Sequence, residues 1–217
     1  MQITLREPGS ALTHFIAMVM AIGGSVPLLM KASEYGSACL ITMLIFISSM
    51  ILLYGASATY HSVNLPAALI KIYRKIDHAM IFVLIAGSYT PVCVLVLAPT
   101  PGYPLLIAVW SFAIVGIVVK LLWINCPKWF SSIIYIAMGW LCAFAFSPIV
   151  NSLPPSAFYW LLAGGLIYTI GGIIYALKLP IFNSKHKYFG SHEIFHLFVM
   201  AGSLCHYIFM YQYVIGL

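Results

Sequence analysis

Two histidines four residues apart are the side chains in this sequence that are best spaced for metal chemistry. His192 and His196 lie in the stretch SHEIFHLFVMAGSLCHY, which begins at Ser191. Residues i and i+4 of an α-helix share one face, so the two imidazoles can bind a single divalent ion. With Glu193 between them, the stretch also matches H-E-x-x-H, the pattern of zinc metalloproteases.

The sequence downstream lacks the third ligand that a soluble zinc protease requires. No Asp or Glu follows His196, and the longer pattern H-E-x-x-H-x-x-G-x-x-H fails at Val199 and Gly202. His206 lies ten residues beyond His196, which is about 15 Å along a straight helix. The third ligand must therefore come from another segment.

His61 is our first choice for the third ligand, and His14 is its competitor. Ser57 and His61 are also four residues apart, at the end of an apolar segment, and Asp77 and His78 begin the next one. Because successive helical residues are about 100° apart, we expect His78 to point away from the face that carries Asp77.

Three neutral imidazoles would leave the fourth position of a tetrahedral zinc ion open for water, as in catalytic zinc sites. A nearby carboxylate can then orient that water and accept its proton. Asp77 and Glu193 are the two choices. Glu193 has the position of the protease base, but an acid in the first turn is also favoured by the helix dipole, so spacing leaves both open.

The composition is that of an integral membrane protein. Of 217 residues, 63% are hydrophobic and 6% are charged, and the mean hydropathy is +1.05. A soluble domain carries charge on about a quarter of its residues. The formal charge of +6 is distributed over short gaps between apolar segments, which favours a role in membrane topology over nucleic-acid binding.

The apolar segments predict an all-α fold with seven transmembrane helices in one domain over residues 1–217. Each segment is near the length of about 20 residues that spans a bilayer. The expected spans are residues 11–30, 38–62, 77–98, 104–124, 131–150, 157–178 and 191–215.

The basic residues predict the orientation of these helices. If alternate gaps lie on opposite sides, nine basic residues share one side and Lys31 is alone on the other. The nine are Arg6, Lys71, Arg74, Lys75, Lys120, Lys128, Lys178, Lys185 and Lys187. The positive-inside rule then places the N-terminus in the cytoplasm and the C-terminus outside. The end of span two and the starts of spans three and seven consequently lie together at the cytoplasmic boundary.

The order of these polar residues resembles the hemolysin III family of bacterial membrane proteins, which is related to the progestin and adipoQ receptors and, more distantly, to alkaline ceramidases. The resemblance rests on S-x3-H closing span two, an Asp opening span three and H-x3-H opening span seven. The opening EPGSALTH also resembles an N-terminal element of the family, at Glu7, Thr13 and His14.

This resemblance implies a zinc ion held by His61, His192 and His196. It also implies that Asp77 reaches the ion through a water and that Ser57 supports the site, which favours Asp77 over Glu193.

The expected function is that of a zinc-dependent intramembrane hydrolase, acting on an amide or ester bond of a lipid in the manner of a ceramidase. We expect it in the bacterial plasma membrane, with a membrane lipid as substrate or ligand. One alternative is a receptor-like or membrane-homeostasis protein in which zinc is structural. Another is a cytolytic, pore-forming hemolysin, although a pore would show polar residues along several helices, and here the charges gather at one end.

Overall fold

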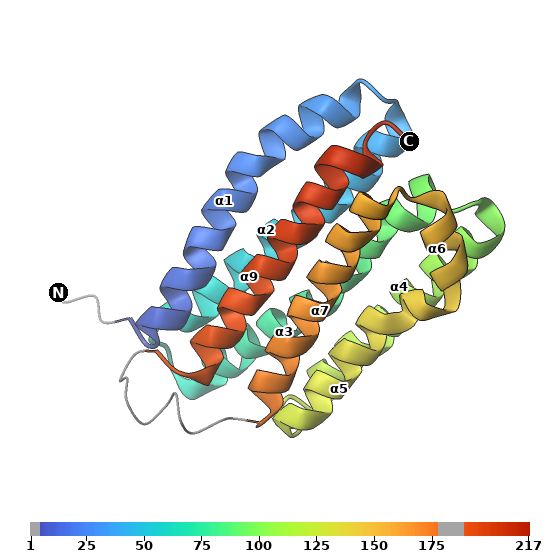
Figure 1. Ribbon diagram of the computed structural model, residues 1–217. Helices are drawn as coiled ribbons and strands as arrows, with labels where there is room; N and C mark the ends of the chain where they lie inside the picture. Colours follow the sequence, from blue (N-terminus) through green and yellow to red (C-terminus); the bar gives the residue numbers. More distant parts are fainter. Residues whose placement is uncertain (1–4, 178–188) are drawn as a thin grey trace.

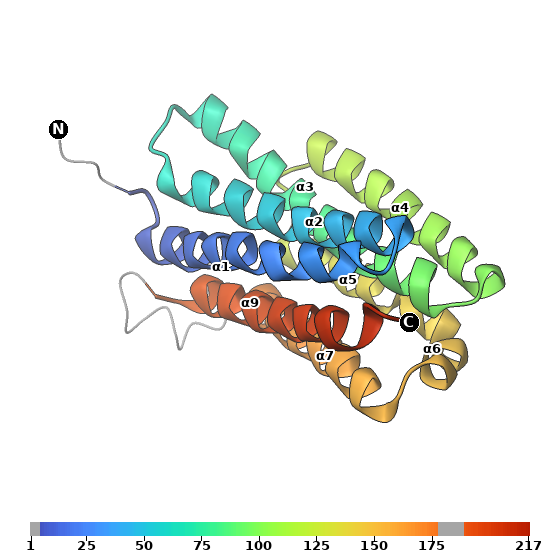
Figure 2. The same ribbon diagram turned by 90° about the horizontal axis from the view of Figure 1, so that it is seen from above.

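The computed structural model describes residues 5–177 and 189–217 of the chain. Seven helices in this part are long and apolar enough to cross a membrane, and no strand occurs in it, which confirms the predicted all-α class. The helices run up and down in a bundle (Figures 1 and 2). The basic residues Lys178, Lys185 and Lys187 lie outside the described residues.

The helix bounds differ from the apolar segments mainly at the ends. The main helices are α1 (Pro8–Ser33), α2 (Ser37–Ser62), α3 (Ala67–Pro91), α4 (Pro99–Leu122), α5 (Lys128–Gly139), α6 (Phe146–Ser152), α7 (Pro155–Leu177) and α9 (Ser191–Phe209). Three irregular turns accompany them: π-helical η1 (Val92–Val96) and η3 (Met210–Val214) extend α3 and α9, and the 3₁₀ turn η2 (Trp140–Ala145) joins α5 to α6.

The expected start of the third span at residue 77 is wrong as a helix boundary. Helix α3 begins at Ala67, where the backbone N–H groups of Leu69 and Ile70 bond to the Pro66 carbonyl. Hydropathy located only the apolar part of this helix, because its first turns carry basic residues. Asp77 therefore lies in the third turn of α3 and is buried.

The fifth span is broken in its middle. A proline cannot donate a helical hydrogen bond and its ring crowds the carbonyl four residues earlier, so Pro148 disturbs the turn that contains Phe144. The Tyr89 hydroxyl of α3 repairs part of this break. It donates to the Gly139 carbonyl at 2.5 Å and accepts from the Cys142 N–H at 2.9 Å.

The helices that carry the candidate site are the most buried ones. In α3, α2 and α9, 67%, 50% and 44% of the apolar window is buried, against 28% or less in the other four spans. Helix α1 packs against both α2 and α9. Its first turns therefore lie beside the end of α2 and the start of α9, at one end of the bundle (Figure 1).

Close packing elsewhere depends on small residues. A Cβ added to Gly116 of α4 would overlap the ring of Phe82 of α3, which is fully buried. Overpacking of this kind is destabilising, so Gly116 sets how closely α3 and α4 approach.

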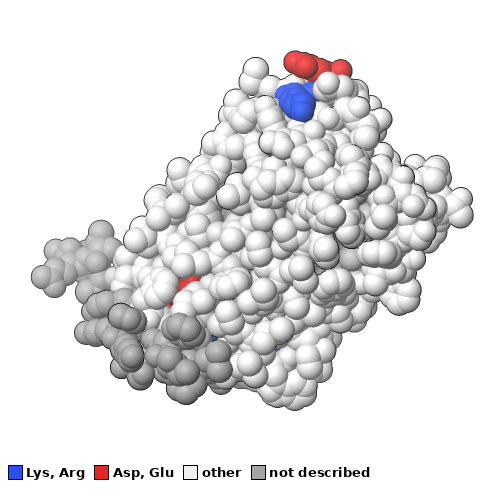
Figure 3. Space-filling view, viewed as in Figure 1, with Lys and Arg blue, Asp and Glu red and all other residues white. Residues whose placement is uncertain are grey.

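The surface matches a lipid-facing protein. Large apolar side chains such as Leu12, Phe15 and Ile107 are exposed on the helices. Figure 3 shows charged side chains only near the two ends of the face in view. Lys120, which was counted as a loop charge, is instead buried and donates to Ser131 and to the Cys126 sulfur.

Candidate metal centre and cavity

Three imidazoles from two helices converge at one end of the bundle. One ligand atom from each of His61, His192 and His196 can be chosen so that all lie within 4.8 Å of one another. The ring centroids of the three pairs are 4.5 to 5.2 Å apart. His61 closes α2, whereas His192 and His196 lie on the first turns of α9, so the fold joins residues more than 130 positions apart.

The hydrogen bond at His61 determines which of its nitrogens is free. Its Nδ1 contacts the Glu7 carboxylate, which can only accept a hydrogen bond. Nδ1 must therefore carry the proton, and Nε2 keeps its lone pair. This carboxylate–histidine arrangement is the usual support of a metal-binding imidazole.

The Thr13 hydroxyl determines in the same way which ring nitrogen of His196 carries the proton. The Thr13 hydroxyl lies 3.1 Å and 3.0 Å from the carbonyls of Gly9 and Ser10, to which it donates its single proton. It can then only accept from His196 Nδ1, 3.1 Å away. The proton of His196 is thereby assigned to Nδ1, and Nε2 is left for a ligand.

The remaining geometry fits a tetrahedral divalent ion. His192 Nε2 lies 3.3 Å from His61 Nε2. Two nitrogens bound to one tetrahedral ion at about 2.0–2.1 Å are themselves about 3.3 Å apart. The three histidines together with their two supporting side chains therefore suit a metal ion with one position left open.

Glu7 also fastens the start of α1 to the end of α2. Its backbone N–H donates to the His61 carbonyl at 3.0 Å, and the Arg6 guanidinium lies 4.1 Å from the Tyr60 ring centroid. The hydrogen bond with His61 lowers the pKa of Glu7 to about 2, so this carboxylate is charged at neutral pH. Spacing gave no role to Glu7 or Thr13, and the only signal for them was the EPGSALTH opening.

His14, the competing third ligand, lies outside the ligand cluster. Its ring stacks on that of His196 with centroids 3.6 Å apart and planes 10° from parallel. Both nitrogens are buried and have no hydrogen-bond partner among the described residues.

Asp77 is buried beside the histidines but is not one of the clustered ligands. Its Oδ2 lies 3.2 Å from Nδ1 of His78, which is also 2.9 Å from the Arg74 carbonyl. The expectation that His78 points away from Asp77 is therefore wrong, because its imidazole turns back along the helix toward the carboxylate and that carbonyl. Ser57 is buried and lines the same cavity as Asp77.

Glu193 has a structural role in the described part of the chain. Its carboxylate accepts a hydrogen bond from the Gly190 N–H at 2.8 Å and another from the Ser10 hydroxyl. The first caps the start of α9 and the second ties α9 to α1. This is the behaviour of a first-turn acid.

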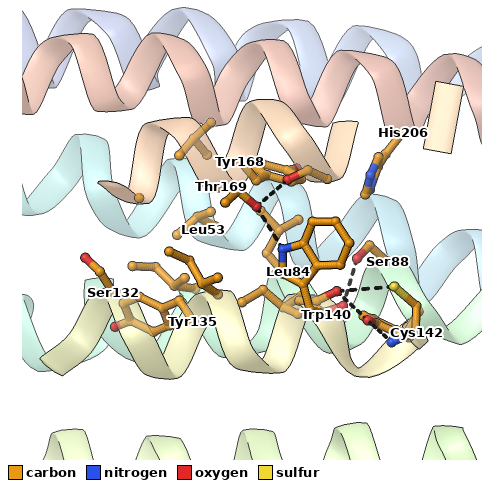
Figure 4. A pocket seen from close by; sticks show the side chains of 18 of the residues that line it. Leu53, Leu84, Ser88, Ser132, Tyr135, Trp140, Cys142, Tyr168, Thr169 and His206 are labelled. Carbon is orange, nitrogen blue, oxygen red and sulfur yellow. Dashed lines mark hydrogen bonds between the residues drawn. The ribbon is translucent and has the colours of Figure 1, made fainter. Parts of the chain in front are cut away.

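A cavity of about 230 Å³ runs from the histidines into the bundle, between α3, α5, α7 and α9. His192, His196 and Asp77 line one end, and Leu105 and Ile149 line the other. Most of the wall between them is apolar. Figure 4 shows Ser132 and Tyr135 toward one end of the cavity, Trp140 in the middle and His206 further along.

Comparison with known proteins agrees with this architecture. Residues 2–207 match the family model described as "Haemolysin-III related". "Hemolysin-3" of Bacillus cereus is 34% identical over 99% of this chain and 94% of its own length, and "Hemolysin-3 homolog" of Bacillus subtilis is 38% identical over 91% and 89%. "Adiponectin receptor protein" of Drosophila melanogaster is 22% identical over 93% of this chain and 49% of its own length. The chain therefore belongs to the haemolysin-III-related family of multi-pass membrane proteins.

Proposed function

We propose that this protein is a zinc-dependent hydrolase that cleaves an amide or ester bond of a membrane lipid. The observation that carries the proposal is that two of the three clustered imidazoles, His192 and His196, line a cavity whose wall is mostly apolar, while His61 completes the ligand set beside them. A lipid whose acyl tail fills this cavity would present its carbonyl to the histidines. Zinc, when bound, would polarise that carbonyl and acidify water.

The protein's own residues would have separate tasks. His61, His192 and His196 would hold the ion, while Glu7 and Thr13 fix the rings of the first and last of these. A histidine ligand that is oriented in this way keeps its free nitrogen available to the metal.

Asp77 would accept the proton released by the attacking water and return it to the amine or alcohol that leaves when the C–N or C–O bond breaks. It lines the cavity together with His192 and His196, and the contact with His78 Nδ1 orients its carboxylate. Ser57, which also lines the cavity, would donate a hydrogen bond to the carbonyl oxygen as charge develops there. The apolar wall would keep other water away and so strengthen these interactions.

The proposal also includes the side of the membrane on which the metal site lies. The excess of Lys and Arg on one side favours a site near the cytoplasmic face of the bacterial plasma membrane.

A second candidate is a receptor-like protein in which zinc is structural, and the name of the Drosophila relative favours it. A third is a cytolytic protein, as the name of the Bacillus cereus relative indicates. Dye leakage from liposomes, compared between the wild type and a zinc-free variant, tests the cytolytic reading directly.

Zinc content and lipid turnover test the first proposal. We expect about one zinc per chain, lost in His61→Ala and in His192→Ala, and full zinc in both variants would refute the site. Asp77→Asn should keep the metal and the melting temperature but stop hydrolysis. Glu34→Gln is its matched control, because Glu34 is exposed at the opposite end of the bundle. Equal lipid turnover in Asp77→Asn and Glu34→Gln membranes would favour the structural-zinc reading.

A further inference from the structure

His206 is a buried histidine in the cavity that the proposed hydrolysis does not use. It is 9% exposed and lines the cavity wall. The Leu161 carbonyl lies near its ring, but neither ring nitrogen makes a hydrogen bond with any described residue. A neutral imidazole has one donor and one acceptor, and buried groups of this kind are normally bonded. His206 therefore has hydrogen-bonding capacity left for a molecule in the cavity.

Tyr168 provides a second polar group beside it. The Tyr168 and His206 rings meet edge to face with centroids 5.3 Å apart, and Tyr168 also lines the cavity. The Tyr168 hydroxyl lies 2.8 Å from Ser203 Oγ, which already accepts the proton of Tyr54 at 2.6 Å. Ser203 can thus donate a hydrogen bond to the Tyr168 oxygen. The Tyr168 hydroxyl is then free to donate its own hydrogen bond to a ligand.

Two glycines make room for these rings. A Cβ on Gly164 of α7 would overlap the His206 imidazole, and a Cβ on Gly202 of α9 would lie 2.8 Å from the Tyr168 ring. Both rings are therefore confined between α7 and α9. Figure 4 shows His206 and Tyr168 on the same side of the cavity, away from Ser132.

The spacing along α9 indicates where on a ligand this pair would act. His206 follows His196 by ten residues of one helix, or about 15 Å. An extended chain advances about 3.6 Å for every three bonds, so this distance corresponds to about twelve bonds. A hydroxyl group both donates and accepts, and it suits His206 in either tautomer.

We propose that His206 and Tyr168 form a polar subsite that binds a hydroxyl group in the middle of an acyl chain, so that the cavity selects hydroxylated lipids. The proposal rests on the proposed function in one respect, the placing of the acyl tail in this cavity with its carbonyl at the histidines.

Binding of free fatty acids to the purified full chain tests the subsite without requiring any hydrolysis. A fluorescent fatty acid is displaced with stearate, with 2-hydroxystearate and with 12-hydroxystearate, whose hydroxyl lies about twelve bonds from the carboxyl group. The wild type should bind 12-hydroxystearate about tenfold more tightly than stearate, a difference of about 1.4 kcal/mol. The 2-hydroxy acid should show no such gain.

Two variants locate the effect. His206→Phe should bind the two acids equally, and the more conservative Tyr168→Phe should reduce the preference while retaining the ring. Equal affinities in the wild type, or a preference that survives in His206→Phe, would overturn the subsite, and so would a failure of 12-hydroxystearate to bind. A protein that shows the preference but hydrolyses no lipid would support the subsite and contradict the proposed activity.

Discussion

Replacing Glu7 by Gln tests whether the first residues of the chain belong to the metal centre. The Glu7 carboxylate accepts a hydrogen bond from the protonated Nδ1 of His61, so the lone pair of Nε2 stays free for a metal. A Gln amide has the same size but lacks the charge, and its nitrogen can donate instead of accept. Loss of such a supporting partner typically weakens metal binding by about 10- to 100-fold.

The expected magnitude for Glu7→Gln lies at the lower end of this range. The side chain of Glu7 is 44% exposed, so water competes for its hydrogen bond and screens its charge. We therefore expect zinc binding to be weakened about tenfold, which corresponds to about 1.4 kcal/mol. The ligand substitution His61→Ala, by contrast, should abolish binding because it removes one of three nitrogens.

Competition with a zinc chelator of known affinity measures this difference on metal-stripped protein in detergent. The matched control is Glu34→Gln, at the opposite end of α1, where the carboxylate is exposed and far from the histidines. The control should bind zinc as the wild type does. Affinities of Glu7→Gln and Glu34→Gln that agree within twofold would refute the role assigned to Glu7.

Three further substitutions test other contacts. Thr13→Val removes the acceptor for a ligand imidazole and should also weaken zinc binding about tenfold in the chelator assay; unchanged affinity would contradict the assigned tautomer. Gly116→Ala should lower stability by about 1–3 kcal/mol, whereas Gly23→Ala, whose added Cβ meets nothing within 4 Å, should be neutral or stabilising in thermal unfolding. Tyr89→Phe should cost about 1–3 kcal/mol because it removes the hydroxyl that bonds to two backbone groups of the broken fifth span. Tyr103→Phe, at an exposed position, is its control, and equal melting temperatures of the two variants would count against the repair of that break.

Much of the fold could be predicted because membrane helices are marked by long apolar runs. The seven predicted segments correspond to the seven candidate spans. The start of α3 could not be predicted in this way, since hydropathy measures burial in lipid and the first turns of that helix are basic. The break before Pro148 also depends on tertiary structure, because a tyrosine of another helix satisfies its backbone groups.

The pairing of His192 with His196 followed from the helical period, and the need for a ligand from elsewhere followed from the lack of acids after His196. Both are local properties, which spacing can reveal. The sequence alone left the roles of Glu193 and His14 open. Their places depend on how α1 lies between α2 and α9, a contact that no periodicity encodes.

The sequence by itself thus determined the class of protein, the number of spans and the residues able to bind a metal, because hydrophobicity and helical spacing act within a single segment. Only the tertiary structure decided which of them meet. It brought Glu7 and Thr13 to the histidines, turned Glu193 toward the cap of its own helix and placed His206 in the cavity wall. Such contacts arise from packing between helices, where one side chain's position depends on segments far away in the chain.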